Sequence, residues 1–343
     1  MSDLLTSTID RLASGEDLSE DAAAAVLAEI MAGNASEVQI AAFLIGLRTK
    51  GETVEEIAGL ARTMRELAAH VDVARDGELL DVVGTGGGRP TFNVSTTAAI
   101  VAAGAGCKVA KHGNRSATGL SGAADVLEAL GARIDLDPAA VGRCIDAVGF
   151  GFMFAPTHHA ATRHVIPVRR ALAVRTIFNF LGPLTNPAGV TRQLTGVADR
   201  RYLEVIAQAF ARLGAVHVLV VSSDDGLDEL STAAPSLVYE VRSGETHSFT
   251  LDAAEVGLDR ARPEELAGGT PEVNAEITRR ILGGERGAPR DVAVLNAGAA
   301  IYVSGGAESP EQGVRAAEAA VDAGAALAKL EQYVAFTKEL AVA

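Results

Sequence analysis

The residues best suited to hold a ligand begin with a glycine-rich stretch, "DVVGTGGGRPTFNVST", that follows an apolar run. Four of the five residues from Gly84 to Gly88 are glycine. A dinucleotide fingerprint would need a further glycine where Arg89 stands, and a P-loop would need Gly-Lys-Ser/Thr at its end. Both patterns therefore fail here. A loose, flexible loop and a phosphate-binding loop of another kind stay open as alternatives.

The continuation of this loop favours anion binding. Asn93, Ser95 and Thr96 bring polar groups to the expected start of a helix. Free backbone N–H groups and the positive end of the helix dipole make such a start a site for anions. Ser95 is also suited to a purely structural role as the N-cap of the helix.

A second polar cluster follows the next expected strand, residues 107–110. Lys111, His112, Asn114 and Arg115 fall within five residues, directly after that strand. A single Lys or His is more often a solvated surface residue. Because parallel strands end at one edge of a sheet, where α/β proteins bind ligands, both clusters are expected to converge there.

A third cluster is acidic and follows the apolar segment "HVLVVSS", residues 217–223. It contains Asp224, Asp225, Asp228 and Glu229. Acidic runs are usually solvated loops, and carboxylates facing a phosphate would repel it. Carboxylates are, however, the hard oxygen ligands that Mg²⁺ prefers, and Mg²⁺ in turn holds a polyphosphate. The combination predicts an Mg²⁺-dependent substrate that carries a diphosphate.

The elements that would position these clusters alternate between strands and helices. Strands are predicted at 78–84, 107–111 and 217–223, helices from Ser95 and across 122–130, and an antiparallel hairpin after residue 236. This order predicts βαβ units with a mainly parallel sheet. Helices dominate from about residue 271. The predicted class is therefore α/β.

Residues 1–70 are predicted to form a separate helical unit. Ser36–Gln39 and Thr53–Glu56 are capping boxes, each followed by apolar residues at helical spacing. The segment 157–187 interrupts the α/β alternation, begins helically and ends in turn-forming residues. We expect it to return to the helical unit, which would make that domain discontinuous.

Composition narrows the class of protein. The chain has 343 residues, 48% of them hydrophobic, and a net charge of −14. Its acidic balance argues against a nucleic-acid partner, which normally needs a basic surface. No apolar run is long enough for a membrane helix, and acids stand where a signal peptide would be basic. Two cysteines form neither a disulfide framework nor a metal set. A cytoplasmic location without a membrane partner is expected.

Taken together, several segments resemble the anthranilate phosphoribosyltransferase family, which belongs to the nucleoside-phosphorylase-like transferases. The matching segments are "VGTGG", "TFNVST", "AGAGCKVAKHGNRS", "SGAADVLEALGA", "GFGFMFAP", "PVRRALAVRTIFNFLGPLTNPAG", "GLDELS" and "LNAGAAIYVSG". They run in family order across nearly the whole chain, and their joint specificity is high. The resemblance identifies the glycine loop as a phosphoribosyl-diphosphate cradle, so no dinucleotide is expected.

The resemblance also implies an architecture and a reaction. A small helical domain (1–72 and about 160–190) would join a large α/β domain (73–159 and 191–343) across a cleft, and helical domains would pair in a homodimer. The expected reaction transfers the phosphoribosyl group to the amine of anthranilate and releases diphosphate, in tryptophan biosynthesis. Phosphoribosyl diphosphate, anthranilate and Mg²⁺ are the implied ligands.

The family's site residues map onto this sequence position by position. Those implied to bind phosphoribosyl diphosphate are Gly84, Gly87, Gly88, Thr91, Asn93, Ser95, Thr96, Lys111, Asn114, Arg115 and Gly119. Those implied for anthranilate are Gly84, Asn114 and Arg169, and those for Mg²⁺ are Ser95, Asp228 and Glu229. Lys111, His112 and Arg169 are the expected catalytic residues, with His112 orienting the amine or acting as a base.

Some positions depart from the family pattern. The loop "GTGGGRPTFN" lacks a usual acid and is one residue shorter, Gly119 and Ala123 replace common serines, and "TAAPS" follows "GLDELS". Three rival interpretations remain. They are a nucleoside phosphorylase on the same fold, a non-enzymatic nucleic-acid-binding relative, and a degenerate paralogue.

Overall fold

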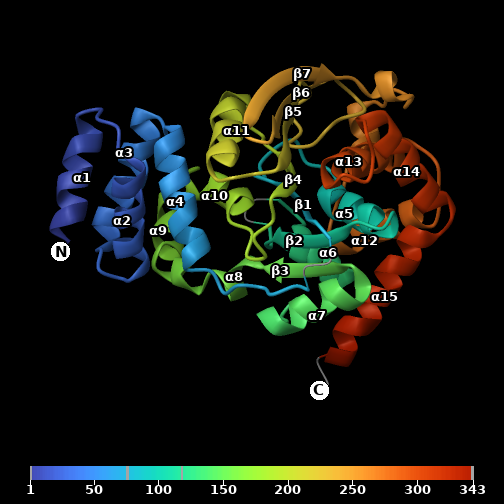
Figure 1. Ribbon diagram of the computed structural model, residues 1–343, viewed down its shortest axis with the longest axis horizontal. Helices are drawn as coiled ribbons and strands as arrows, with labels where there is room; N and C mark the ends of the chain where they lie inside the picture. Colours follow the sequence, from blue (N-terminus) through green and yellow to red (C-terminus); the bar gives the residue numbers. More distant parts are fainter. Residues whose placement is uncertain (1, 75–76, 117–118, 341–343) are drawn as a thin grey trace.

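A four-helix unit begins the chain in this computed structural model, which describes residues 2–74, 77–116 and 119–340 (Figure 1). Its helices are α1 (Asp3–Ala13), α2 (Glu20–Met31), α3 (Glu37–Lys50) and α4 (Val54–Glu66). Both predicted capping boxes are present: the Ser36 and Thr53 hydroxyls accept backbone N–H groups at Gln39 and Glu56, whose side chains reach back. These caps satisfy donors that a helix start would otherwise leave unpaired.

A seven-stranded sheet forms the centre of the larger part, in the order β3-β2-β1-β4-β5-β6-β7. The pairings among β1 to β5 are parallel, and β6 and β7 join as an antiparallel hairpin. The strands are β1 (Leu79–Gly84), β2 (Lys108–Gly113), β3 (Phe150–Phe154), β4 (Arg192–Gly196), β5 (His217–Ser223), β6 (Ser236–Arg242) and β7 (Glu245–Leu251). The predicted α/β class and the mainly parallel sheet are confirmed.

One strand is longer than predicted. β2 does not end at residue 110 but continues to Gly113, because residues 109–113 pair with β3. Lys111 and His112 therefore lie within the sheet and are buried, rather than in the loop that follows it.

Helices cover both faces of the sheet. α5 packs on β1 and against α13, α14 and α15 on one side, while α11 packs on β5 and β6 on the other (Figure 1). The helices of this part are α5 (Val94–Gly104), α6 (Ala123–Ala129), α7 (Pro138–Val148), α11 (Leu203–Arg212), α12 (Pro271–Leu282), α13 (Ala288–Ser304), α14 (Pro310–Asp322) and α15 (Ala325–Leu340). Short 3-10 turns are η1 (Ala160–His164), η2 (Arg200–Tyr202), η3 (Ala253–Val256) and η4 (Pro263–Leu266).

The segment after β3 runs back to the four-helix unit. It consists of α8 (Ala155–His158), η1, α9 (Ile166–Leu172) and α10 (Phe178–Leu184). η1 contacts α2, α9 contacts α3, and α10 contacts α4. Its apolar residues from Val165 to Leu184 share one hydrophobic cluster with those of α1 to α4. Across the described residues, no helix combines the length and apolar character needed to cross a membrane.

Candidate active site

The glycine loop between β1 and α5 is ordered by contacts with the acidic loop after β5. The Gly86 N–H donates to a carboxylate oxygen of Asp228 at 2.8 Å, and the Thr85 N–H donates to the carbonyl of Gly196 at 2.8 Å. Gly86 has a φ of +70°, which favours glycine. A Cβ on Gly84 would lie 2.7 Å from an Asp228 carboxylate oxygen, and one on Gly88 would lie 2.5 Å from the other. The glycines therefore allow a carboxylate to approach the backbone.

The start of α5 differs in detail from the prediction. Asn93 occupies the N-cap position, so the alternative role of Ser95 as N-cap is wrong. The Asn93 side chain makes no cap bond, and instead binds Ser121 and Asn274. Thr96 is buried, and within the described chain its hydroxyl oxygen has no hydrogen-bond partner. Thr91 is half-buried beside the loop. Ser95 lies in the first turn of the helix and is half-buried.

Lys111 lies beneath this helix start and reaches toward it. Its Nζ atom donates to the Val82 carbonyl at 2.5 Å and to the Ser95 hydroxyl at 3.4 Å. Only 1% of the residue is exposed. Desolvation lowers the pKa of the ammonium group, and the neighbouring Asp81 and Glu229 carboxylates oppose this shift. Lys111 therefore links strand β2 to Ser95 through the interior of the protein.

The acidic pair, Asp228 and Glu229, also lies beside Ser95. Glu229 is buried and accepts a hydrogen bond from the Ser95 backbone N–H, and Asp228 is half-buried. Acidic runs are usually solvated, but Glu229 is buried because the loop folds back over the end of β4. Gly196, the last residue of β4, approaches the Asp228 carbonyl so closely that a side chain there would overlap it.

The electrostatics of the pair suit a divalent cation. Burial raises the pKa of both Asp228 and Glu229, and for Glu229 the neighbouring Asp228 charge raises it further. Two adjacent carboxylates and a hydroxyl are the hard oxygen ligands that Mg²⁺ prefers, and the ion would neutralise the charge of the carboxylates. These residues fit the predicted metal. No cluster of three or more His, Cys, Asp or Glu side chains suited to a metal occurs in the described ranges, so water or substrate would complete the coordination.

His112 belongs to a buried group of three histidines. Its ring lies 5.1 Å from that of His159, and its Nδ1 atom lies 3.2 Å from the Gly182 carbonyl. Burial is the main cause that lowers the pKa of His112 to about 3 and that of His159 to about 4. His158 is buried as well. At neutral pH these rings are uncharged, so His112 is a weak base.

The loop after β2 places its predicted residues at the surface. Asn114, Arg115 and Gly119 are all exposed. Arg115 makes ion pairs with Asp125 at 2.8 Å and Glu128 at 2.5 Å, which occupy much of its guanidinium. The Gly119 N–H donates to the Ser116 hydroxyl at 2.7 Å. These residues lie apart from the contacts that join the glycine loop to Asp228.

Arg169 lies in the last turn of α9, within the segment that joins the four-helix unit. Its guanidinium sits 5.5 Å from the centre of the Phe178 ring. Arg169 is half-buried, whereas the neighbouring Arg170 is exposed. Desolvation lowers the pKa of Arg169. A half-buried guanidinium over an aromatic ring is suited to hold a carboxylate on an aromatic molecule.

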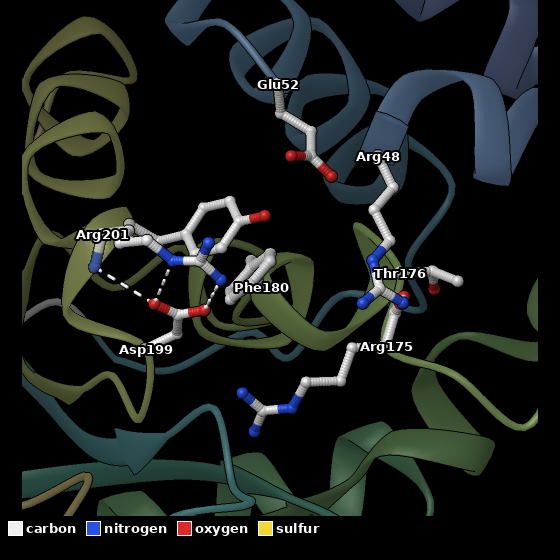
Figure 2. Close-up of a pocket in the computed structure, with 8 residues that line it drawn as sticks. Arg48, Glu52, Arg175, Thr176, Phe180, Asp199 and Arg201 are labelled. Atoms are coloured by element: carbon white, nitrogen blue, oxygen red, sulfur yellow. Dashed lines mark hydrogen bonds and ion pairs between the residues drawn. The ribbon is translucent and has the colours of Figure 1, made fainter. Parts of the chain in front are cut away.

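The sequence did not predict a cavity that lies between the end of α3, residues 175–180 and residues 199–202 (Figure 2). It measures about 200 Å³. Its lining residues are Arg48, Glu52, Arg175, Thr176, Phe180, Asp199, Arg201 and Tyr202. The Arg48 guanidinium donates to the Arg175 carbonyl at 2.7 Å, and the Arg175 guanidinium donates to the Gly86 carbonyl.

Charges of both signs line this cavity, with three guanidinium groups (Arg48, Arg175 and Arg201) and two carboxylates (Glu52 and Asp199). Arg201 pairs with Asp199 at 2.7 Å, but among the described residues neither Arg48 nor Arg175 has a carboxylate partner. Thr176 is buried, and among the described residues its hydroxyl has no hydrogen-bond partner. The one available sequence signal was Arg175, which lies inside the matched segment "RTIFN".

Comparison with known proteins agrees with this architecture. The helical bundle domain of a glycosyl transferase family matches residues 6–68, and the α/β domain of the same family matches residues 76–327. The chain therefore belongs to this glycosyl transferase family.

Its relatives carry a more particular name. The anthranilate phosphoribosyltransferase of Rubrobacter xylanophilus is 53% identical over 340 residues, covering 98% of this chain and 99% of the relative. The crystal structure of the Thermus thermophilus enzyme of that name has a TM-score of 0.91 at 46% identity, covering 96% and 99%. The Saccharomyces cerevisiae enzyme, in complex with PRPP and Mg, has a TM-score of 0.91 at 29% identity, covering 99% of each chain. The family resemblance predicted from the sequence is confirmed.

Proposed function

We propose that this protein transfers the phosphoribosyl group of phosphoribosyl diphosphate to the amine of anthranilate and releases diphosphate, as a step of tryptophan biosynthesis. The observation that carries this proposal is the junction of the glycine loop, Ser95, Lys111, Asp228 and Glu229 at one edge of the sheet. Backbone N–H groups there suit phosphate oxygens, and the paired carboxylates suit a divalent cation that accompanies diphosphate.

The donor substrate would be held by the loop and the start of α5. Gly84, Gly87, Gly88, Ser95 and Thr96 would line the phosphate site. The N–H groups of Thr85, Gly86 and Ser95 already bind Gly196, Asp228 and Glu229. The proposed donors are therefore the Gly87 and Thr96 N–H groups and the Thr96 hydroxyl, which lacks a partner within the described residues. Lys111 would add positive potential from beneath Ser95. Asn114, Arg115 and Gly119 are exposed, and the family resemblance alone supports their proposed contact with the donor.

Asp228, Glu229 and Ser95 would hold Mg²⁺, in part through water. When bound, the ion would neutralise the diphosphate and stabilise the charge that develops on it as it leaves. The ribose carbon gains oxocarbenium character as the bond to diphosphate lengthens, so this chain's residues act mainly by positioning and by stabilising charge.

Anthranilate would approach from the side of the four-helix unit. Arg169 is the proposed partner of its carboxylate, with Asn114 and Gly84 near the amine. Arg48 and Arg175 are the competing candidates, because their guanidinium groups face the cavity beside the glycine loop (Figure 2). His112 stays neutral, so its proposed role is to orient the amine through a lone pair rather than to act as a strong base.

The remaining expectations are also proposals. We infer a two-domain division at 1–72 with about 160–190 against 73–159 with 191–343, supported by the packing of α9 and α10 on α3 and α4. A homodimer through the helical domains is supported by Val38 on α3, of which 78% is exposed, and Leu4 on α1. A cytoplasmic location and the absence of nucleic-acid and membrane partners stay predictions from the sequence.

A fluorescence assay tests the reaction directly. Anthranilate emission should fall when phosphoribosyl diphosphate is added with Mg²⁺, and the fall should stop when the metal is chelated. Absence of turnover under both conditions would overturn the proposal. Turnover of uridine or thymidine with free phosphate would instead favour the rival nucleoside phosphorylase.

A further inference from the structure

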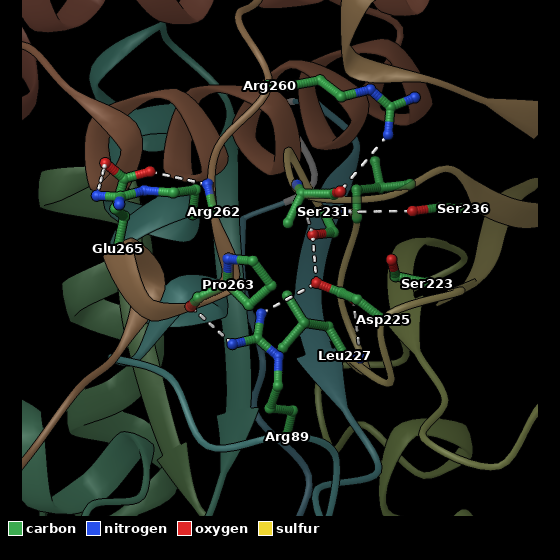
Figure 3. Close-up of polar contacts among 12 residues, drawn as sticks. Arg89, Ser223, Asp225, Leu227, Ser231, Ser236, Arg260, Arg262, Pro263 and Glu265 are labelled. Atoms are coloured by element: carbon green, nitrogen blue, oxygen red, sulfur yellow. Dashed lines mark hydrogen bonds and ion pairs between the residues drawn. The ribbon is translucent and has the colours of Figure 1, made fainter.

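Arg89, the residue that breaks the dinucleotide pattern, joins three separate segments (Figure 3). Its backbone N–H donates to the Gly226 carbonyl at 2.8 Å. Its guanidinium donates to the Pro263 carbonyl at 2.8 Å and to an Asp225 carboxylate oxygen at 3.0 Å. The glycine loop is thereby tied to the acidic loop and to η4.

Asp225 is in turn fixed by its own loop. It accepts a hydrogen bond from the Ser231 hydroxyl at 2.9 Å, and its side chain is 10% exposed, against 25% for Arg89. A partly buried, hydrogen-bonded ion pair holds its geometry better than a surface pair, because less water competes for the charges. The pair of Arg262 and Glu265 nearby is more exposed, at 77% and 40%, so more water competes for its charges.

The pair of Arg89 and Asp225 joins the glycine loop to the acidic loop, so it can affect ligand binding. Hydrogen bonds join the glycine loop to the acidic loop at two points: Gly86 on Asp228, and Arg89 on Asp225 and Gly226. Gly87 and Gly88 lie between these points, and Gly88 packs against Asp228. A glycine backbone has great conformational freedom once such contacts are released. If Arg89 were released, the donor N–H groups would have to be ordered when the ligand binds.

We propose that Arg89 and Asp225 are a positioning pair that sets the glycine loop against the acidic loop before the phosphorylated substrate binds. The inference rests on the proposed function for the identity of that substrate. The pair acts by reducing the ordering cost of binding.

The test compares Arg89→Ala, Asp225→Asn and the double variant with Arg262→Ala as the matched control. Asp225→Asn keeps an acceptor for Ser231 but removes the charge. The two single variants should raise the KM for phosphoribosyl diphosphate about tenfold, while kcat and the KM for anthranilate change less than about twofold. The double variant should be no worse than the poorer single variant, Arg89→Lys should restore part of the loss, and Arg262→Ala should match the wild type.

Backbone amide exchange of residues 85–89, without any ligand, is the second measurement. It should accelerate in Arg89→Ala and Asp225→Asn but not in Arg262→Ala. Unchanged exchange, additive effects in the double variant, or equal changes in both KM values would overturn the proposal. If the wild type shows no transfer, the proposed function fails, yet the exchange rates still decide whether the pair orders the loop.

Discussion

At the scale of single residues, the three buried histidines make stability sensitive to acid. His159 titrates at about 4 in the folded protein, mainly because burial disfavours its charged form. An unfolded histidine has a pKa near 6.5, so the unfolded state binds more protons between these values. The contribution of His159 to stability is therefore complete above pH 6.5 and is lost as the pH falls toward 4.

His159→Asn should remove this dependence. When the pH is lowered from 7 to 5, the wild type should lose on the order of 2 kcal/mol more of its free energy of unfolding than the variant. Urea unfolding at both pH values measures the difference. A constant offset between the two proteins across this range would contradict the assignment.

Ala173 adopts a backbone conformation that suits glycine better. It follows α9 with φ 52° and ψ 27°, in the left-handed region, and it is exposed. A non-glycine residue costs roughly 1 kcal/mol there. Ala173→Gly should therefore raise the melting temperature with little loss of packing, and Ala171→Gly, within the same helix, should lower it. Scanning calorimetry compares the two, and a lower melting temperature for Ala173→Gly would contradict this interpretation.

At the scale of elements, the acidic loop after β5 trades stability for ligand binding. Burial is the main cause that raises the pKa of Asp228 and of Glu229, and repulsion from the Asp228 charge raises that of Glu229 further. The double variant Asp228→Asn/Glu229→Gln keeps an acceptor for Gly86 while removing that repulsion. It should unfold at the same or a higher temperature, yet transfer should slow by roughly a hundredfold and need more Mg²⁺.

Asp224→Asn is the control for that variant. Asp224 belongs to the same loop but is exposed and pairs with Arg200 at 2.5 Å. It should change neither the melting temperature nor the Mg²⁺ requirement. Wild-type dependence on Mg²⁺ in the double variant would show that the paired acids do not hold the metal.

The end of α9 gives a test of substrate recognition. Loss of a charged hydrogen-bond partner costs about 1.5–3 kcal/mol. Arg169→Ala should therefore raise the KM for anthranilate well above tenfold, with a smaller effect on phosphoribosyl diphosphate, whereas the exposed neighbour Arg170→Ala should have no effect. Steady-state kinetics with Arg175→Ala in parallel decide between the two guanidinium groups. A selective loss in Arg175→Ala alone would move the carboxylate site to the cavity.

Short sequence patterns predicted the helices and strands better than they predicted the contacts between these elements. The capping boxes of α3 and α4, the alternation of strands and helices, and the hairpin of β6 and β7 follow from short stretches of sequence. The burial of Glu229 does not, because it depends on the acidic loop crossing Gly196. Likewise, Arg48 reaches a carbonyl 127 residues away along the chain, and no local pattern reveals that pairing.

At the scale of the whole molecule, the four-helix unit is not complete by itself. Phe180, Leu181 and Leu184 from α10 are buried in the same hydrophobic cluster as the residues of α2 to α4. A fragment of residues 2–70 would expose the surfaces that η1, α9 and α10 cover. We expect it to be helical by circular dichroism but to associate, bind a hydrophobic dye and unfold without cooperativity. A monomeric fragment with a cooperative transition would contradict this.

The return of the chain to its first helices has a consequence during synthesis. On the ribosome, α1 to α4 emerge long before the segment from Ala155 to Leu184 that covers them. At typical elongation rates the delay is on the order of ten seconds, far longer than helix formation needs. During this time the apolar side of the nascent helices is therefore exposed to solvent. Slowing translation between α4 and α10 should make the newborn chain more dependent on chaperones, whereas slowing it after α10 should not.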